Sequence, residues 1–340
     1  MPRTKNNGLQ TEEVLFEVDA QVKKEFLDTL KKSTRIFYSY VLKLADEFEQ
    51  TIGKSIYNFN IEERDELLLV KFKNRSAGAF KSNLTPLKKY VDFCIAPKNI
   101  VKHYENRFSA ILTKDYEKYV NFQAMENAYT PKSVVRELEE LLINEQDQLI
   151  LELLSWGLRG RTEKENTLED LTNLKVKDVN WDDKVLHLID NDGQDRHIEV
   201  DDYTLDLIKK TINKGFYYFN NGLQKGKNEF GEYDKTEKGF QINETEYVFR
   251  VPGKNKSGKV NHQFFEGRMS RIKKWIEKPY ITISSLYFSS IIDYAKKLKD
   301  EKGELTKDDY ISINEIFAYG DDGEKYWYKT QDLINMYIGK

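Results

Sequence analysis

Apolar residues recur every three or four positions through the N-terminal third of the chain, which is the spacing of amphipathic helices. The longest stretch of this kind predicts a helix over residues 22–52, and a shorter one predicts a helix within 61–74. The same spacing over residues 103–122 predicts another helix. We therefore expect this part of the chain to be helical throughout.

A further helix is predicted to begin at Ser76, whose hydroxyl can cap it, and to run to about residue 95. Pro86 interrupts its apolar face and is expected to kink or split it. Together these elements predict an all-helical domain over residues 21–127. The polar residues 1–20 predict a disordered or flexible N-terminus.

The segment NAYTPKS, residues 127–133, is expected to lead into a second domain over residues 128–340. Thr130 or Ser133 is the expected cap of the next helix, with Pro131 in its first turn. Two helices are predicted to follow this start.

The period of the pattern then changes to two. Residues 184–189 and 196–200 alternate around the turn at 191–193, which predicts a β-hairpin. A helix with an acidic cap should follow, and the Gly- and Asn-rich residues 215–246 are expected to form an inserted loop. Four helices are predicted in the rest of the chain, over 262–277, 284–300, 306–318 and 328–338. The predicted fold class is mainly α with a small β-sheet (α+β), in two domains.

Composition narrows the class of protein. Of the 340 residues, 33% are charged and 13% are aromatic, which predicts a soluble chain with enough apolar material for two cores. No run of 18 apolar residues exists, so neither a membrane span nor a signal peptide is expected. The single cysteine, Cys94, excludes an internal disulfide and fits a reducing cytoplasm. The four histidines have no zinc-type spacing, so we expect no metal and no cofactor.

Positive charge is concentrated in residues 250–278, which carry nine Lys and Arg against two Glu, although the net charge of the chain is −3. Such a concentration is typical of a protein that turns one side towards nucleic acid. The plainer interpretation is a solvated basic helix, and charge alone leaves both open.

A more specific pattern follows residue 152, in the stretch LLSWGLRGRTEKENTLEDLTNLKVKDVNWDDKVLHL. An apolar helix ends in Gly-Leu-Arg, and a short acidic helix precedes the first strand. This pattern resembles the start of the catalytic domain of the tyrosine recombinases (phage integrases), with about six extra residues after the arginine. The matching residues are Gly157, Leu158, Arg159, Leu171, Leu174 and Asp178.

The resemblance implies a two-domain tyrosine-recombinase-like clamp around DNA. In that arrangement the helical domain is a core-binding domain and the second domain is of the recombinase catalytic type. The stretch SAGAFKSNLTPLKKYVDFC, residues 76–94, is similar to the core-binding domain of the family.

In that family a tyrosine hydroxyl attacks a DNA phosphate, and two arginines with a histidine or lysine manage the charge and protons. The first arginine is matched by Arg159, with Arg161 as the alternative. The histidine and second arginine positions hold Ser284 and Tyr287, and the hairpin turn where the lysine is expected is acidic. Tyr337 is the candidate nucleophile. The resemblance thus implies a recombinase scaffold that has lost its catalysis.

Several of these residues also have plainer interpretations. Ser284 fits the N-cap of the helix that follows it, and Tyr337 fits an aromatic that packs a helix. Arg196 is expected either to reach a phosphate or to pair with Asp201. Residues 253–259, GKNKSGK, lack the spacing of a phosphate-binding glycine loop, so this stretch predicts no nucleotide site.

We expect a sequence-specific, DNA-binding transcriptional repressor that controls phage lysogeny, since a recombinase pattern without its catalytic residues resembles the lysis–lysogeny repressors of SPbeta-like Bacillus phages. One alternative is an active site-specific recombinase that uses Tyr337, and another is a helical protein-interaction module with an acidic partner. The residues expected to bind DNA are Arg75, Lys81, Arg159, Arg161, Arg196, Lys254, Lys256, Lys259, His262, Arg268, Arg271 and Lys274.

The expected partner is double-stranded operator DNA, bound by a monomer or a weak dimer in the bacterial cytoplasm, at the nucleoid. A phage anti-repressor protein is a further candidate partner, and no membrane partner is expected.

Overall fold

A computed structural model gives the structure of the chain as two compact units, which we describe separately. The first comprises Met1–Glu126 and the second Asn127–Lys340, and the boundary predicted from the sequence lies one residue further along. The structure describes residues 15–74, 76–96, 98–101, 105–160, 168–191, 193–224, 228, 234–251, 258–319 and 323–338.

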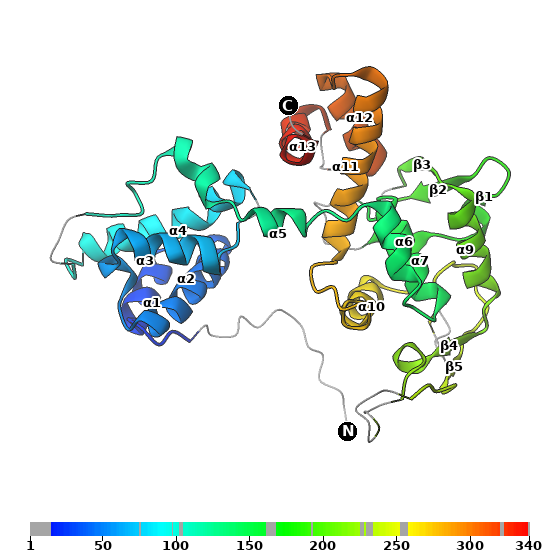
Figure 1. Cartoon of the computed structure of the whole chain (residues 1–340), viewed down its shortest axis with the longest axis horizontal. Helices are drawn as coiled ribbons and strands as arrows, with labels where there is room; N and C mark the ends of the chain where they lie inside the picture. The colour runs from blue at the N-terminus through cyan, green and yellow to red at the C-terminus, as the bar shows by residue number, and fades with distance from the viewer. Residues whose placement is uncertain are drawn as a thin grey trace. The chain divides into compact units, whose positions relative to one another are not determined.

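The first unit is helical in its described part (Figure 1). Its core is built from apolar faces of α1, α2 and α4, and its largest fully buried side chains include Tyr90, Phe59 and Phe80. Its α-helices are α1 (Ala20–Asp28), α2 (Lys32–Ile52), α3 (Ile61–Glu66), α4 (Ala77–Ile95) and α5 (Phe122–Glu126). Shorter helical turns are η1 (Ile56–Asn58), the π-helical η2 (Leu67–Lys71) and η3 (Thr113–Tyr119).

The helices of this unit differ from the predicted ones in three places. The helix predicted over 22–52 is two helices, because the chain is extended at Lys31 (ψ 146°). Ser76 caps α4 as predicted, its hydroxyl accepting from the backbone N–H of Ala79 at 3.1 Å, but Pro86 lies inside α4 without splitting it. The prediction of a helix throughout 103–122 is wrong, since within the described residues 105–121 only Thr113–Tyr119 is helical.

A buried ion cluster fixes the start of the first unit. The Lys23 ammonium is fully buried, donates to Asp46 at 2.7 Å and to Val18 O at 2.9 Å, and also pairs with Glu49. The Asp46 carboxylate accepts from the backbone N–H groups of Glu17 and Val18 as well. Residues 17 and 18, which the sequence assigned to a flexible N-terminus, are therefore held against α2.

The second unit combines helices with two small sheets (Figure 1). Its helices are α6 (Lys132–Glu139), α7 (Glu145–Ser155), α8 (Glu169–Asn173), α9 (Asp202–Asn213), α10 (His262–Trp275), α11 (Ile283–Lys302), α12 (Lys307–Phe317) and α13 (Gly323–Ile338), with short turns η4 (Val176–Asp178) and η5 (Phe219–Gly222). Its strands are β1 (Val179–Asn180), β2 (Val185–Ile189), β3 (Asp195–Glu199), β4 (Phe216–Tyr218) and β5 (Gly239–Gln241).

The predicted hairpin is confirmed, with β2 and β3 antiparallel and His187 opposite His197. Strand β1 adds to it, giving the order β1-β2-β3. The acidic cap of α9 is also confirmed, because Asp201 accepts from the backbone N–H of Thr204 at 3.0 Å. Residues 215–246 are not simply a loop, since they contain the antiparallel pair β4 and β5 with Phe216 opposite Gln241.

Two cores stabilise the second unit. The larger one surrounds α7, whose buried residues include Leu149, Leu153 and Leu154, and the smaller one joins α11, α12 and α13. The predicted caps Thr130 and Ser133 are replaced by Pro131 at the N-cap of α6. The backbone N–H of Thr130 instead donates to Ser289 Oγ of α11 at 2.9 Å. No helix of the described residues is long and apolar enough to cross a membrane.

A polar network ties α6, α7 and α9 together inside the larger core. The fully buried Glu152 accepts from Arg136 at 2.7 Å and from the Thr204 hydroxyl at 2.6 Å. Nearby, the buried Glu139 accepts from the Tyr203 hydroxyl at 2.7 Å. Burial, followed by repulsion from Glu152, raises the pKa of the Glu139 carboxyl to about 8.

Replacing this carboxyl should change how stability depends on pH. A carboxyl with a raised folded pKa stabilises the fold most below its unfolded pKa, near 4.5, and loses that contribution as pH rises to about 8. Glu139→Gln keeps an acceptor for Tyr203 but cannot ionise, so its Tm relative to the wild type should be higher at pH 8 than at pH 5. Thermal melting at both pH values measures this, with the exposed Glu140→Gln as control. A Glu139→Gln difference that is equal at the two pH values would contradict the buried, protonated carboxyl.

Candidate nucleic-acid interface

The Gly-Leu-Arg segment is the C-terminal cap of α7. The N–H of Leu158 donates to Leu153 O at 3.0 Å and that of Gly157 to Leu154 O at 3.0 Å, with φ +85° at Gly157. This pair of bonds is a Schellman motif, which requires a residue that tolerates positive φ. A side chain at Gly157 would also collide with the Phe317 ring and lie 2.8 Å from Ser290 Oγ. The glycine therefore fixes both the end of α7 and the position of the next residues.

Arg159 follows this cap and lies among tyrosines. Its guanidinium carbon is 5.3 Å from the ring centre of Tyr287. The phenol of Tyr319 interacts electrostatically with the same guanidinium. Burial lowers the pKa of Arg159 and raises the pKa of Tyr319. The surroundings of Arg159 are thus aromatic.

Tyr287, at the position of the second recombinase arginine, is fully buried in α11. Its hydroxyl donates to the backbone carbonyl of Phe317 at 2.9 Å, and burial raises its pKa well above the usual value. Ser284 lies in the first turn of the same helix, half-buried. The prediction that Ser284 caps α11 is wrong, because Thr282 is the N-cap and forms a capping box with Ser285.

Arg196 does not pair with Asp201, and its side chain is committed within the protein. Both terminal nitrogens pair with the Asp170 carboxylate, and Nε donates to Ile316 O at 3.1 Å. The carboxylate of Asp201 instead caps α9 and pairs with Arg136. Arg196 is thus held by Asp170 and Ile316, and a role for it in DNA binding stays a prediction.

The hairpin turn, where the recombinase lysine is expected, is held by hydrogen bonds from neighbouring elements. The backbone N–H of Asn191 donates to Glu169 at 2.6 Å, and Asn173 donates to Asn191 Oδ1 at 3.2 Å. The exposed Lys259 donates to Asn173 at 2.6 Å. A lysine of the basic segment thus reaches a residue bonded to this turn, although Lys259 is far from the turn in sequence.

The basic segment separates into buried and exposed parts. Arg268 is 3% exposed and lies over the Tyr217 ring at 3.6 Å, so its side chain is buried, and DNA binding by it stays a prediction. Arg250, also 3% exposed, donates to Thr211 O and Lys214 O at the end of α9. The exposed cations of α10 include Arg271 and Lys274, and His262 is half-buried at the start of the helix.

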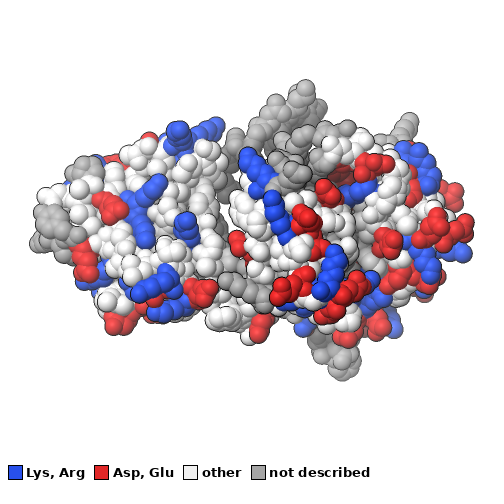
Figure 2. All heavy atoms as spheres, turned by 90° about the horizontal axis from the view of Figure 1, so that it is seen from above, with Lys and Arg blue, Asp and Glu red and all other residues white. Residues whose placement is uncertain are grey.

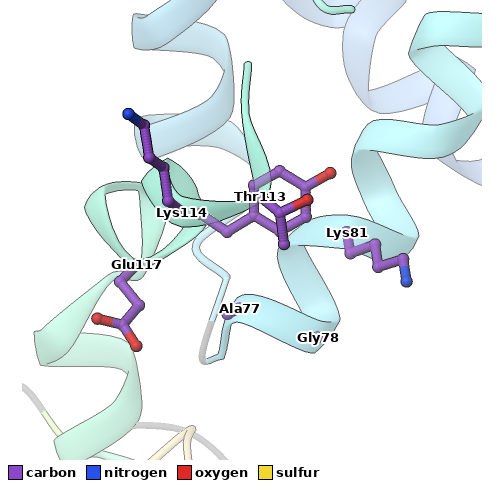
Figure 3. Close-up of a pocket in the computed structure, with 7 residues that line it drawn as sticks. Ala77, Gly78, Lys81, Thr113, Lys114 and Glu117 are labelled. Carbon is purple, nitrogen blue, oxygen red and sulfur yellow. The ribbon is translucent and has the colours of Figure 1, made fainter.

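In the first unit, Lys81 lines a cavity of about 360 Å³ between the start of α4 and η3. Exposed Lys114 lines it too, with Thr113 and Glu117. Figure 3 shows Lys81 and Lys114 extending in different directions, so they do not converge on one anion. These two lysines are available for separate contacts with an extended anionic surface.

Four predicted DNA-binding residues, Arg75, Arg161, Lys254 and Lys256, lie outside the described residues. Tyr337 is half-buried, with its ring centre 5.7 Å from that of Tyr129. On the face shown in Figure 2, Lys and Arg are interspersed with Asp and Glu rather than gathered in one basic patch. Among the described residues there is no group of His, Cys, Asp and Glu that could hold a metal ion.

Sequence reasoning missed two residues of this site, Asp170 and Tyr319. Asp170 is buried and interacts with the backbone amides of Arg159 and Gly160 as well as with Arg196. In the sequence it looked like part of an acidic helix start. Tyr319 follows Ala318, which ends α12 in the left-handed conformation at φ +50°. A non-glycine residue with positive φ has no clear signal in sequence.

Comparison with protein families gives two matches. The model of the family described as "MrpR, C-terminal catalytic domain" matches residues 129–338, and that of "MrpR, N-terminal core-binding domain" matches residues 16–96. No curated protein matches the chain.

Solved structures similar to this chain include two recombinases and a phage integrase. They are XerA recombinase (14% identity, 92% of this chain and 92% of that chain, TM-score 0.37), the integrase of mycobacterium phage Brujita (9%, 93% and 89%, 0.36) and XerH recombinase in a post-cleavage complex with palindromic difH substrate (14%, 92% and 80%, 0.37). The two units of this chain thus correspond to the core-binding and catalytic domains of the matched family, and they are mainly α with small sheets.

The close contact at Gly157 can be tested against a glycine that differs only in its surroundings. Gly193 also has positive φ (+80°), but a side chain there would meet nothing within 4 Å. Gly193→Ala should cost about 1–2 kcal/mol from backbone strain alone. Gly157→Ala should lower the free energy of unfolding by a further ~1–3 kcal/mol, because the Phe317 ring must move to make room for the new methyl group. Urea unfolding of both variants measures this difference in the free energy of unfolding. An equal decrease in the two variants would contradict the prediction, because it would show that the Phe317 ring moves without cost.

Proposed function

The chain belongs to the MrpR family, and from this premise we propose that it binds double-stranded DNA sequence-specifically without cutting it, as a transcriptional repressor that controls phage lysogeny. The observation that carries the proposal is the state of Tyr287. A buried aromatic stands where a cation is needed, and its hydroxyl is already bonded to a carbonyl of the chain.

The loss of catalysis follows from the chemistry of phosphoryl transfer. Fixed donors must stabilise charge that develops on the phosphate oxygens, and each one is worth roughly 3–4 kcal/mol by analogy with single oxyanion donors. Tyr287 contributes no cation, Arg196 is paired with Asp170, and Ser284 replaces a proton-transferring histidine. Of the family-matched positions among the described residues, Arg159 is the one that keeps its cation, and we propose that it holds a phosphate without the further donors needed to break one.

Helix α10 supports the DNA-binding part of the proposal. Its exposed residues recur at helical spacing along one face, and a helix can enter the major groove of DNA. Arginine and glutamine are side chains that read base edges, while lysine holds phosphates. The residues of this face, which we call the α10 face, are Gln263, Glu266, Gly267, Ser270, Arg271 and Lys274, so one carboxylate lies among its two cations.

Further phosphate contacts are proposed outside α10. Lys259 is exposed beside the hairpin turn, and Lys81 and Lys114 are exposed in the first unit. Their distribution over several elements suits an elongated polyanion better than a compact anion.

We propose that the chain acts as a monomer or weak dimer. The apolar residues of α13 are used within the chain itself, since Ile334 is fully buried with Ile313 and Phe317 of α12. The Thr330 hydroxyl also donates to Asn314 of α12. Because these residues of α13 are buried against α12, they are not available to pack against a neighbouring copy of the chain. An anti-repressor protein would then act on a single chain or on its DNA-binding surface.

The DNA-binding proposal predicts a steep dependence of affinity on salt. DNA pulldown and footprinting with the purified chain should yield an operator fragment, and a reporter gene behind it should be repressed. Fluorescence anisotropy between ~50 and ~200 mM salt should show a linear fall of log affinity with log salt concentration. The slope should be about −0.9 for each phosphate contact. Arg271→Ala and Lys274→Ala should each weaken binding and flatten that slope, whereas the exposed Lys297→Ala on α11 should not. A salt-independent affinity would refute this interface.

The loss of catalysis predicts that no covalent protein–DNA adduct forms. The operator fragment, nicked to trap an attacking tyrosine, should yield no adduct with the wild-type chain over hours. Mass spectrometry of any product would identify the tyrosine, since α13 also contains Tyr328, which is 45% exposed, besides Tyr337. An adduct that disappears in Tyr337→Phe would establish the alternative, an active recombinase.

A further inference from the structure

A groove with a volume of about 370 Å³ lies between α10 and the β4–β5 sheet. Aromatic rings line it, with Tyr217 and Phe240 stacked at 5.1 Å and Phe219 meeting Phe240 edge-on at 5.2 Å. Phe264 and Trp275 line it from the side of α10. Grooves of this size with aromatic walls are typical of sites for small molecules.

Arg268 lines this groove and its guanidinium is poorly satisfied. The side chain is buried, yet Nε has no hydrogen-bond acceptor among the described residues. Its ion pair with Asp147 spans 3.7 Å, which is longer than a hydrogen bond, and Oδ1 of that carboxylate also has no described donor. A buried cation with few acceptors is costly, so an additional anion in the groove would stabilise it.

Gly267 is a second, independent sign of an occupant. It lies inside α10, where glycine costs about 1 kcal/mol relative to alanine. Its φ is not positive, and a side chain there would meet nothing within 4 Å. Neither backbone geometry nor packing within the described chain therefore requires glycine at the floor of the groove. A ligand that approaches the backbone of α10 would require it.

We propose that the groove binds a small aromatic anion of the nucleoside monophosphate class. The base would pack against the rings of Tyr217, Phe240 and Trp275, and the phosphate would accept from Arg268 and Arg271. The lining contains two arginines and no carboxylate, so its charge suits an anion. Arginine is the side chain best suited to phosphate, because its donors form a planar fork.

Duplex DNA does not fit this groove. The phosphates of a duplex lie on a broad convex surface and reach exposed side chains, whereas Arg268 is 3% exposed. Exposed Arg271 belongs both to the groove and to the α10 face. A ligand that engages Arg271 would therefore weaken DNA binding, and this consequence alone rests on the proposed function.

Titration of the full chain without DNA tests the site directly. Isothermal calorimetry with adenosine 5′-monophosphate should give saturable binding at one site, with quenching of Trp275 fluorescence. Adenosine and ribose 5-phosphate, which each carry half of the ligand, should bind at least ~10-fold more weakly. Failure of both adenosine and guanosine 5′-monophosphate to bind at millimolar concentration would overturn the proposal. Equal binding of ribose 5-phosphate and inorganic phosphate would show only adventitious anion binding, and would overturn it too.

Three substitutions on α10 locate the site. Gly267→Leu fills the groove and should abolish binding while keeping or raising the Tm, since leucine favours the helix. Arg271→Gln should weaken binding at least ~10-fold, and Lys274→Gln, which removes the same charge outside the groove, should not. Unchanged affinity in a folded Gly267→Leu variant would place the ligand elsewhere and refute the site.

A final arm separates this site from the DNA-binding proposal. Adenosine 5′-monophosphate should lower the affinity of the wild type for the operator fragment, but not that of Phe240→Ala, which removes a ring of the groove on β5, outside the α10 face. Ligand binding without any DNA binding would leave the groove established and refute the repressor. DNA binding without ligand binding would refute the groove as a ligand site and leave the DNA-binding proposal standing.

Discussion

The Asp170–Arg196 ion pair holds together the elements on which the site depends. Its carboxylate is fully buried, and burial raises the pKa of Asp170 while Arg196 opposes that rise. The same carboxylate interacts with the backbone amides of Arg159 and Gly160, and Arg196 also donates to Ile316 O of α12. One pair therefore joins α8, β3, α12 and the segment after α7. Removing either partner of such a pair leaves an unpaired buried charge, which typically costs about 3–5 kcal/mol.

Tyr287 shows how one position serves the packing of the second unit. A second arginine there would need an anion or a carboxylate for its charge. Tyrosine instead packs into the core of α11, α12 and α13, and its single donor is satisfied by Phe317. Phe317 also lies against Gly157, so the cap of α7 and Tyr287 share one neighbour. Aromatic packing thus fixes the position of the segment after α7 relative to α11 and α12.

Sequence patterns predicted those features that depend on residues close together in the chain. The β2–β3 hairpin, the Asp201 cap and the Ser76 cap belong to this group. Features set by distant partners were missed, because the partner of Arg196 is 26 residues away and was hidden in an acidic helix. The cap of α11 was misplaced by two residues, since Thr282 and Ser284 are equally suitable by type. The β4–β5 pair was missed because its strands have only three residues each.

The basic segment illustrates why a count of charges does not define a surface. Arg268 and Arg271 lie three positions apart and are neighbours on one side of α10, yet Arg268 is buried at its edge and Arg271 is exposed. The buried arginine faces the aromatic groove, and the exposed one lies on the α10 face while also lining the groove. Two ligands that share Arg271 must affect each other reciprocally, because binding free energies are linked in both directions. Operator DNA that engages Arg271 would therefore weaken binding in the groove by the same factor by which the small anion weakens binding of DNA.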